Sequence, residues 1–241
     1  CDEATAEGDR FGVWTCSAAD KDTANRVLNP WNLDLGGIAK DDGTLVWGVV
    51  TVDPRIAVAY VDDGSGTPVY YRTLDSLFRN LPEGDLDIRI TQDAKGLELK
   101  EPVDVTGRKI LISSEGGAFS ISGIAAKTGG FIVGEGGELT FENIEIDGFD
   151  GEWFVRIPEE GGTFTIGENV WMHDLHAVGA DDPGEYPNGL IVMLGGIMKM
   201  DTNSLLSGCS YQNGLGSVIA LYGGMLDIAG ASIIGCSTEM H

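Results

Sequence analysis

The six residues GGTFTI at positions 161–166 are one copy of a phrase, Gly-Gly-x-Φ-x-Φ with Φ apolar, that recurs in the second half of the chain. The other copies are GGAFSI at 116–121, GGELTF at 136–141, GGIMKM at 195–200 and GGMLDI at 223–228. Successive Gly pairs are 20, 25, 34 and 28 residues apart, and a second short apolar stretch follows each of the last four copies. Recurrence at such intervals is the sequence signature of a repeat protein.

Each repeat contains strand and turn patterns but no helix, which excludes leucine-rich, ankyrin and tetratricopeptide solenoids. A propeller blade needs four strands in about 40–45 residues, more than these intervals hold. We therefore predict an all-β fold in which residues 70–241 form a right-handed parallel β-helix, a solenoid of short parallel strands. Stacking of coils about 4.8 Å apart aligns equivalent residues in ladders. The predicted inward ladders are Phe119, Leu139, Phe164, Met198 and Leu226, and Ile121, Phe141, Ile166, Met200 and Ile228.

The residues before the repeats predict a small N-terminal β unit, residues 1–69, followed by one helix. Thr44–Val52 and Ile56–Val61 are β-branched and apolar with a turn signal between them, which predicts a hairpin. Apolar residues at helical spacing predict a helix over Val69–Leu81, with Thr73 or Asp75 as its N-cap. Because only one face of this helix is apolar, we expect it to cap the open end of the β-helix.

Charge and hydropathy exclude two classes of partner. The chain carries 15 Lys and Arg against 38 Asp and Glu, a net charge of -23, which repels nucleic-acid phosphates. No run of 18 apolar residues is present, so no membrane insertion is predicted. The acidic composition favours an extracellular or cell-surface location. Cys1 is either a lipid-anchored cysteine exposed by removal of a leader or a trimmed terminus.

The last residues stop in the middle of the repeat pattern, without an amphipathic cap. We expect that the natural protein continues past His241, or that a partner chain covers this end, for example by end-to-end self-association.

Four cysteines permit two disulfides, Cys1 with Cys16 and Cys209 with Cys236. Aligning the second strands of the last two repeats places Cys209 and Cys236 at one inward position on adjacent coils. Either a disulfide or a buried thiol pair is consistent with that position, and we favour the thiol pair slightly.

Residues 70–112 resemble the first coils of the pectin-lyase-like right-handed β-helices, with a helix followed by DIRITQDAKGLELKEPVDVTGRKILISS (87–114). The coil GGTFTIGENVWMHD (161–174) resembles repeats in surface proteins and adhesins of gut-type bacteria. The resemblance implies sites on an outer sheet face or a long turn, built from paired carboxylates, or from Ca²⁺ with a Lys or Arg base. It does not fix a function, because β-helices serve as lyases, hydrolases, adhesins and stalks.

The strongest candidates for catalysis are acidic residues close to one histidine. Asp147, His173 and Asp174 fall at corresponding turns of adjacent coils, and Asp181 and Asp182 lie in the longest insertion, residues 176–188. Two carboxylates and a histidine could perform acid–base glycoside hydrolysis. The alternative, which we favour, is an acidic solvent-exposed loop. No cofactor or metal site is predicted, although weak Ca²⁺ binding at acidic Gly loops is left open.

Three further residues could bind a sugar: Trp171, Glu185 and Tyr186. Trp171 alternates with apolar Val170 and Met172, so its side chain should point outward. The leading hypothesis is a non-catalytic, secreted or cell-surface module for adhesion or display, with a glycan or host surface protein as partner. The alternatives are a polysaccharide-active lyase or glycoside hydrolase and a purely structural stalk.

Overall fold

The computed structural model describes the strands at residues 5–6, 14–15, 34–39 and 45–51, and residues 56–62, 68–79, 81–179, 188–212 and 216–239. The chain divides into two compact units, Cys1–Pro82 and Glu83–His241. The predicted bounds of the domains, residues 1–69 and 70–241, stay a prediction. Among the described residues, no helix has the length and apolar character needed to cross a membrane.

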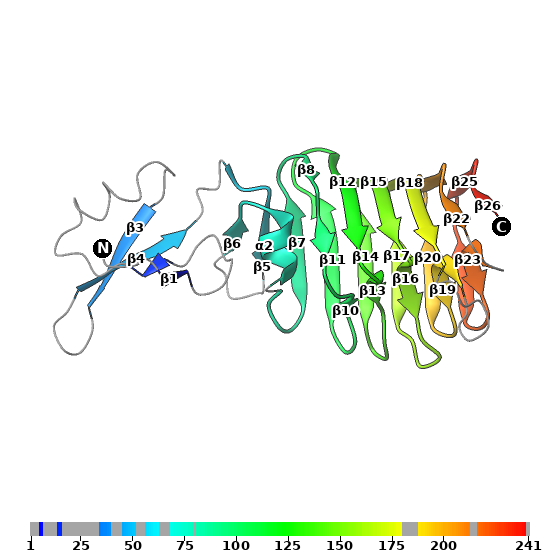
Figure 1. Ribbon diagram of the computed structural model, residues 1–241, viewed down its shortest axis with the longest axis horizontal. Coiled ribbons are helices and arrows are strands. Elements are labelled where there is room, and N and C mark those ends of the chain that lie inside the picture. The colour runs from blue at the N-terminus through cyan, green and yellow to red at the C-terminus, as the bar shows by residue number, and fades with distance from the viewer. Residues whose placement is uncertain are drawn as a thin grey trace. The chain divides into compact units, whose positions relative to one another are not determined.

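Among its described residues, the first unit contains three antiparallel strand pairs and a short helix (Figure 1). β1 (Thr5–Ala6) pairs with β2 (Trp14–Thr15), β3 (Asp34–Ala39) with β4 (Leu45–Thr51), and β5 (Ala59–Asp62) with β6 (Val69–Tyr71). The predicted hairpin between Thr44–Val52 and Ile56–Val61 is therefore wrong. The sequence does contain both strands, but each pairs elsewhere, and β3 was missed because Gly36 and Gly37 interrupt its apolar pattern at a bulge.

The helix, α2 (Leu74–Arg79), is shorter than predicted. Val69–Tyr71 forms β6 because β-branched and aromatic residues favour a strand, and this strand has a partner in β5. Thr73 is the N-cap, since its Oγ1 accepts a hydrogen bond from the Ser76 backbone N–H at 3.2 Å. Its role as a cap of the β-helix stays a prediction.

The second unit is a parallel β-solenoid of about 5 turns, as the repeats predict (Figure 1). Its coils build three parallel sheets. Sheet 1 contains β7 (Leu86–Ile90), β11 (Lys109–Ser114), β14 (Glu138–Glu142), β17 (Thr163–Ile166), β20 (Ile197–Met200) and β24 (Met225–Ile228). Sheet 2 contains β8 (Ala94–Lys95), β12 (Phe119–Ala126), β15 (Ile144–Gly151), β18 (Trp171–Val178), β21 (Leu205–Ser207) and β25 (Ser232–Ile234), with β9 (Glu98–Leu99), β22 (Ser210–Gln212) and β26 (Ser237–Glu239) beside them. Sheet 3 contains β10 (Val103–Asp104), β13 (Gly129–Ile132), β16 (Trp153–Ile157), β19 (Gly189–Met193) and β23 (Ser217–Leu221).

The predicted ladders are confirmed in sheet 1 from β14 onward. Leu139, Phe164, Met198 and Leu226 are in register, and so are Phe141, Ile166, Met200 and Ile228. The prediction was wrong for Phe119 and Ile121, which lie in sheet 2 and pair with Ile144 and Ile146. Ile110 and Ile112 of β11 take their places, because β11 has the alternating pattern of the repeat without its Gly pair.

Aromatic rings fill the middle of the solenoid. Phe154 lies 5.7 Å from Phe131, 6.1 Å from Phe141 and 5.2 Å from Phe149, measured between ring centroids. Phe141 also meets Phe164 edge to face at 6.1 Å. Such pairs contribute about 0.5–1.5 kcal/mol beyond the burial of their area. The core therefore joins all three sheets through one cluster of rings.

The Gly pairs lie at corners, but in four pairs only one glycine has the predicted positive φ, and in Gly161–Gly162 neither has. The glycine with positive φ is the first of the pair at Gly116 and Gly136 and the second at Gly196 and Gly224. At Gly162 the reason for glycine is close approach, since an added Cβ would lie 1.9 Å from the Gly137 carbonyl oxygen of the coil below.

A second corner, inside the long strands of sheet 2 or between two of its short strands, also has left-handed backbone. Its positions are Gly96, Gly123, Gly148, Asp174, Gly208 and Gly235, with φ of 73°, 66°, 80°, 53°, 61° and 64°. We call this set the sheet 2 corner row. Asp174 is its only member with a side chain.

Candidate functional site

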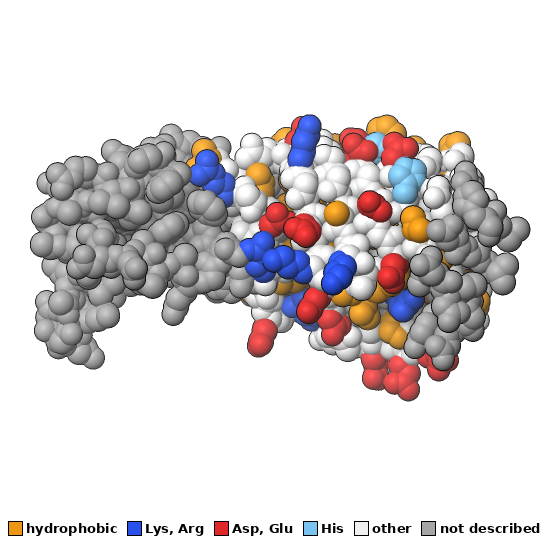
Figure 2. Space-filling view, in the orientation of Figure 1, with side chains coloured by type: hydrophobic (Ala, Val, Ile, Leu, Met, Phe, Trp, Pro, Cys, Tyr) orange, Lys and Arg blue, Asp and Glu red, His pale blue; other side chains and the backbone are white. Residues whose placement is uncertain are grey.

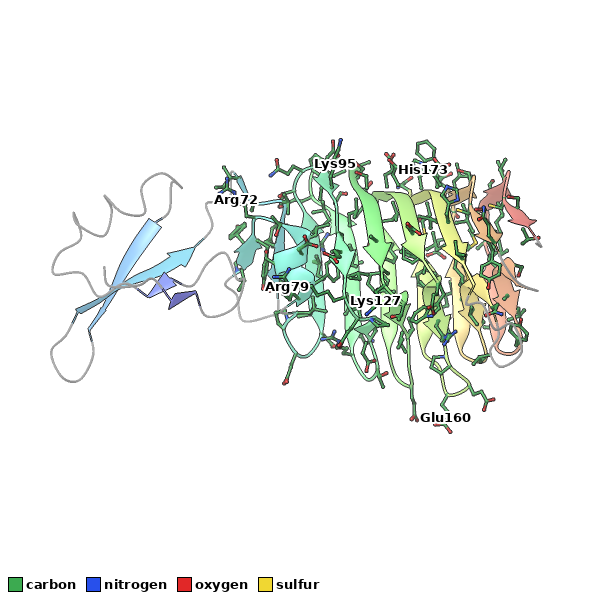
Figure 3. The ribbon with its side chains drawn as sticks, in the orientation of Figure 1. Arg72, Arg79, Lys95, Lys127, Glu160 and His173 are labelled. Carbon is green, nitrogen blue, oxygen red and sulfur yellow. The ribbon has the colours of Figure 1, made fainter. Side chains whose placement is uncertain are left out.

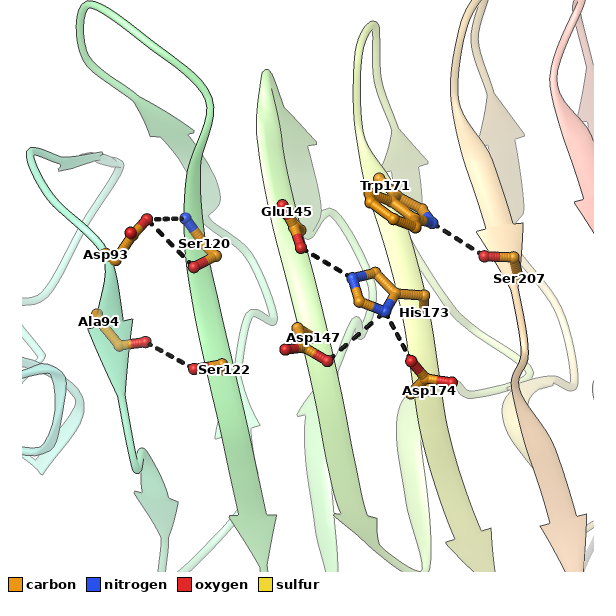
Figure 4. Close-up of polar contacts among 10 residues, drawn as sticks. All are labelled: Asp93, Ala94, Ser120, Ser122, Glu145, Asp147, Trp171, His173, Asp174 and Ser207. Atoms are coloured by element: carbon orange, nitrogen blue, oxygen red, sulfur yellow. Dashed lines mark hydrogen bonds and ion pairs between the residues drawn. The ribbon is translucent and has the colours of Figure 1, made fainter.

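The outer face of sheet 2 brings chemically active side chains together. Register aligns Glu145 with Trp171, and in the next outward row it aligns Asp147, His173 and Ser207 (Figure 4). Asp174 follows in the corner row. In Figure 3, His173 and Lys95 project from the same upper edge of the solenoid, consistent with the pairing of β8, β12, β15 and β18. Figure 2 shows acidic side chains close to the histidines at this edge.

His173 lies at the centre of three carboxylates. Its Nε2 is 2.9 Å from Glu145 Oε1, and its Nδ1 is 2.9 Å from Asp174 Oδ2 and 3.5 Å from Asp147 Oδ1. Only 13% of the His173 side chain is exposed. We call Glu145, Asp147, His173 and Asp174 the His173 cluster.

The contacts of His173 favour its protonated form. An ionised carboxylate only accepts hydrogen bonds, so a neutral imidazole would direct one nitrogen lone pair at a carboxylate oxygen. The imidazolium instead donates from both nitrogens. Burial lowers the pKa of His173, but the hydrogen bonds to Asp174 and Glu145 and the charge of Asp147 raise it by more, so that its pKa lies above the ordinary value of 6.5.

Trp171 forms an exposed aromatic surface beside this cluster. Its side chain points outward, as the alternation predicts, and 44% of the residue is exposed. The indole Nε1–H donates a hydrogen bond of 2.9 Å to Ser207 Oγ, and the ring stacks on His173 with 4.1 Å between centroids. Contact with an imidazolium adds a cation–π attraction of about 0.5–1 kcal/mol. The ring is therefore held in one orientation while its outer surface stays open.

Asp174 reaches His173 because of its unusual backbone. With φ of 53° it occupies the left-handed conformation that glycine takes on the neighbouring coils. Left-handed backbone costs an L-residue about 1–2 kcal/mol, although Asp tolerates it better than most. His176, two residues later, is exposed, and its Nδ1 is 2.7 Å from Ser210 Oγ.

The structure thus brings together Asp147, His173, Asp174 and Trp171 of the predicted site. Asp181, Asp182, Glu185 and Tyr186 lie outside the described residues, as do Cys1 and Cys16. Sequence analysis missed Glu145. The signal was present, because Glu145 is two residues before Asp147 in an alternating strand and must share its face.

A lyase mechanism would need a Lys or Arg base, and neither Arg156 nor Lys127 belongs to the His173 cluster. Arg156 belongs to β16 of sheet 3, where its guanidinium lies 4.9 Å from the centroid of the Trp153 ring. Lys127 follows β12 of sheet 2, at the turn toward sheet 3.

Cys209 and Cys236 are stacked on adjacent coils, as predicted: the Ser237 N–H donates to the Cys209 carbonyl, and the next residues pair in register. Both thiols are free, with Cys209 buried and Cys236 partly buried. Burial, together with the neighbouring Cys236 thiol, raises the pKa of Cys209 to about 12.

No protein-family model, curated protein or solved structure matches this chain.

Proposed function

We propose that the chain is a non-catalytic, secreted or cell-surface module that binds a glycan on the outer face of sheet 2, and so serves adhesion or display. The observation that carries this proposal is Trp171, an exposed indole fixed by Ser207 and His173 and bordered by carboxylates. The apolar face of a pyranose ring can stack on such an indole while its hydroxyl groups donate hydrogen bonds to carboxylate oxygens.

The charge of this face restricts the glycan class. Glu145, Asp147 and Asp174 surround His173, on which the indole stacks, and the chain has a net charge of -23. A polyanionic glycan such as polygalacturonate would be repelled. Neutral sugars and amino sugars are therefore the proposed ligands.

The test is glycan binding by isothermal titration calorimetry with neutral, amino and acidic oligosaccharides. Trp171→Ala should weaken binding of the preferred neutral or amino sugar at least tenfold, which corresponds to about 1.4 kcal/mol. Tyr222→Ala is the matched control, since Tyr222 is also an exposed aromatic residue but lies after β23 of sheet 3. Equal losses in the two variants, or preference for acidic glycans, would contradict the proposal.

A polysaccharide-active enzyme is the second candidate. It is favoured by His173, a histidine in contact with two aspartates, because a positioned acid next to a carboxylate is the minimum for acid–base cleavage of a glycosidic bond. Incubation with a polysaccharide panel, with and without Ca²⁺, would show reducing ends or unsaturated products if this is correct. Turnover that disappears in Asp174→Asn would replace the binding proposal. If the protein shows neither glycan binding nor turnover, the hypothesis of a purely structural stalk remains.

A further inference from the structure

We propose that Asp147, His173 and Asp174 form a binding site for a divalent transition-metal ion such as Mn²⁺ or Zn²⁺, with His173 Nδ1 and one oxygen of each carboxylate as ligands. These three ligand atoms all lie within 4.8 Å of one another, and they form the only such group of three among the described residues. Metal–ligand bonds of about 2.0–2.2 Å place neighbouring ligand atoms roughly 3–4 Å apart, so only small side-chain movements are needed.

Glu145 supports this assignment from the other side of the imidazole ring. Its Oε1 lies 2.9 Å from His173 Nε2, where it accepts the Nε2–H hydrogen bond. Histidine ligands in metal sites commonly donate their second N–H to a carboxylate, which fixes the tautomer and the ring orientation. Here that contact fixes Nδ1 as the nitrogen that faces Asp147 and Asp174.

Stacking on Trp171 restricts the imidazole further. The two rings are 4.1 Å apart between centroids and inclined by 31°. The indole is itself bonded to Ser207. The nitrogen ligand is therefore positioned before any ion binds, which lowers the entropic cost of binding. The ion takes the place of the Nδ1 proton, so binding to the protonated ring releases one proton to solvent.

The donor set selects the class of ion. Ca²⁺ prefers six to eight oxygen ligands, and Mg²⁺ keeps most of its water, so neither gains from an imidazole nitrogen. One imidazole with two carboxylates suits Mn²⁺, Zn²⁺ and their neighbours in the series. Three protein ligands also leave coordination positions open for water or for a hydroxyl group of a ligand.

The solenoid confines this donor set to one pair of coils. On the coils before and after, the positions equivalent to Asp147 and His173 are Ser122 and Ser207, and those equivalent to Asp174 are glycines. A single site is thus expected in the described part of the chain, and it does not depend on the glycan proposal.

The test is Mn²⁺ binding to the full chain after treatment with EDTA, followed by electron paramagnetic resonance. Mn²⁺ is the probe because it binds thiols weakly, so the cysteines do not interfere. We expect one bound ion, with nitrogen coupling from one imidazole in the pulsed spectrum. His173→Gln should remove the coupling and weaken binding at least tenfold, and Asp147→Asn should weaken binding by a similar factor.

His176→Gln and Asp150→Asn are the matched controls. They lie on the same two strands as the cluster and pair with each other in register, three residues after Asp147 and His173, but do not belong to the cluster. Glu145→Gln should weaken Mn²⁺ binding about tenfold without removing the nitrogen coupling. The proposal fails if wild-type protein binds no stoichiometric Mn²⁺, if Ca²⁺ competes on equal terms, or if the controls weaken binding as much as His173→Gln. Circular dichroism of each variant shows whether the fold is retained.

Discussion

Replacing Asp174 separates the cost of its backbone conformation from the contribution of its carboxylate. Asp174 has φ of 53°, and its neighbours in the sheet 2 corner row are Gly148 at 80° and Gly208 at 61°. A Cβ in this conformation costs about 1–2 kcal/mol relative to glycine. Asp174→Ala keeps that cost and loses the carboxylate, whereas Asp174→Gly loses both.

The contribution of the carboxylate is small because the Asp174 side chain is 62% exposed. An exposed ion pair contributes about 0.2–1 kcal/mol, so its loss in Asp174→Gly is roughly offset by relief of the backbone cost. We therefore expect Asp174→Gly to be as stable as wild type within about 1 kcal/mol, and Asp174→Ala to be less stable than Asp174→Gly by about 1–2 kcal/mol.

Thermal unfolding followed by circular dichroism measures this difference. For a domain of this size, 1 kcal/mol shifts the Tm by about 2–4 °C, so the Gly variant should melt about 2–8 °C above the Ala variant. The matched pair is Asp150→Gly and Asp150→Ala, because Asp150 lies in β15 without positive φ. There alanine should be the more stable residue by about 0.5–1 kcal/mol. If alanine is equal to or better than glycine at position 174 as well, the left-handed corner is refuted.

Four further outcomes follow from the described contacts. The pKa of His173 is raised in the folded state, so the protonated ring stabilises the fold fully below pH 6.5, and this stabilisation is lost as the pH rises through the folded-state pKa. The Tm of His173→Gln, measured in EDTA, should therefore fall further below the wild-type Tm at pH 5.5 than at pH 9. Peptide mapping after iodoacetamide should find native Cys209 unmodified, since its pKa is about 12, and modified only after denaturation; equal labelling of Cys209 and Cys236 in the native state would contradict this. Phe154→Ala should destabilise the solenoid by about 3–5 kcal/mol in urea unfolding, because it empties the centre of the ring cluster; a loss below about 1 kcal/mol would argue against that core. Ile228 continues a core ladder but is 46% exposed on β24, so a chain of these 241 residues alone should self-associate in sedimentation velocity and its Ile228→Lys variant should be monomeric; a monomeric 241-residue chain would argue against association through β24.

The solenoid could be predicted from the sequence because the residues that specify its strands lie in one short segment that repeats along the chain. The same Gly-Gly-x-Φ-x-Φ phrase forms β14, β17, β20 and β24, and in each the alternating apolar residues must face one core. The prediction failed at β11, where the strand has the alternation but no Gly pair. Register there depends on contacts with β7 and β14, residues distant in sequence.

The site was harder to predict because its contacts, like those of β11, join residues that are distant in sequence. Alignment of the second strands placed Asp147 beside His173, and this pairing is correct. What alignment cannot give is the diagonal contact of Glu145 with His173, which depends on rotamers and on the stacking of Trp171. The hairpin in residues 44–61 failed because two adjacent β patterns do not specify which strands pair.

The His173 cluster draws all of its residues from β15 and β18, two strands that pair directly. Each coil is bonded only to the coils before and after it, so adding or deleting a whole coil elsewhere would leave this pair intact. The position of the site along the solenoid axis can therefore change in steps of about 4.8 Å without any change in its chemistry. A coil inserted between β15 and β18 would instead separate these two strands and abolish the site. For this architecture, the distance between the site and either end of the solenoid is set by the number of coils.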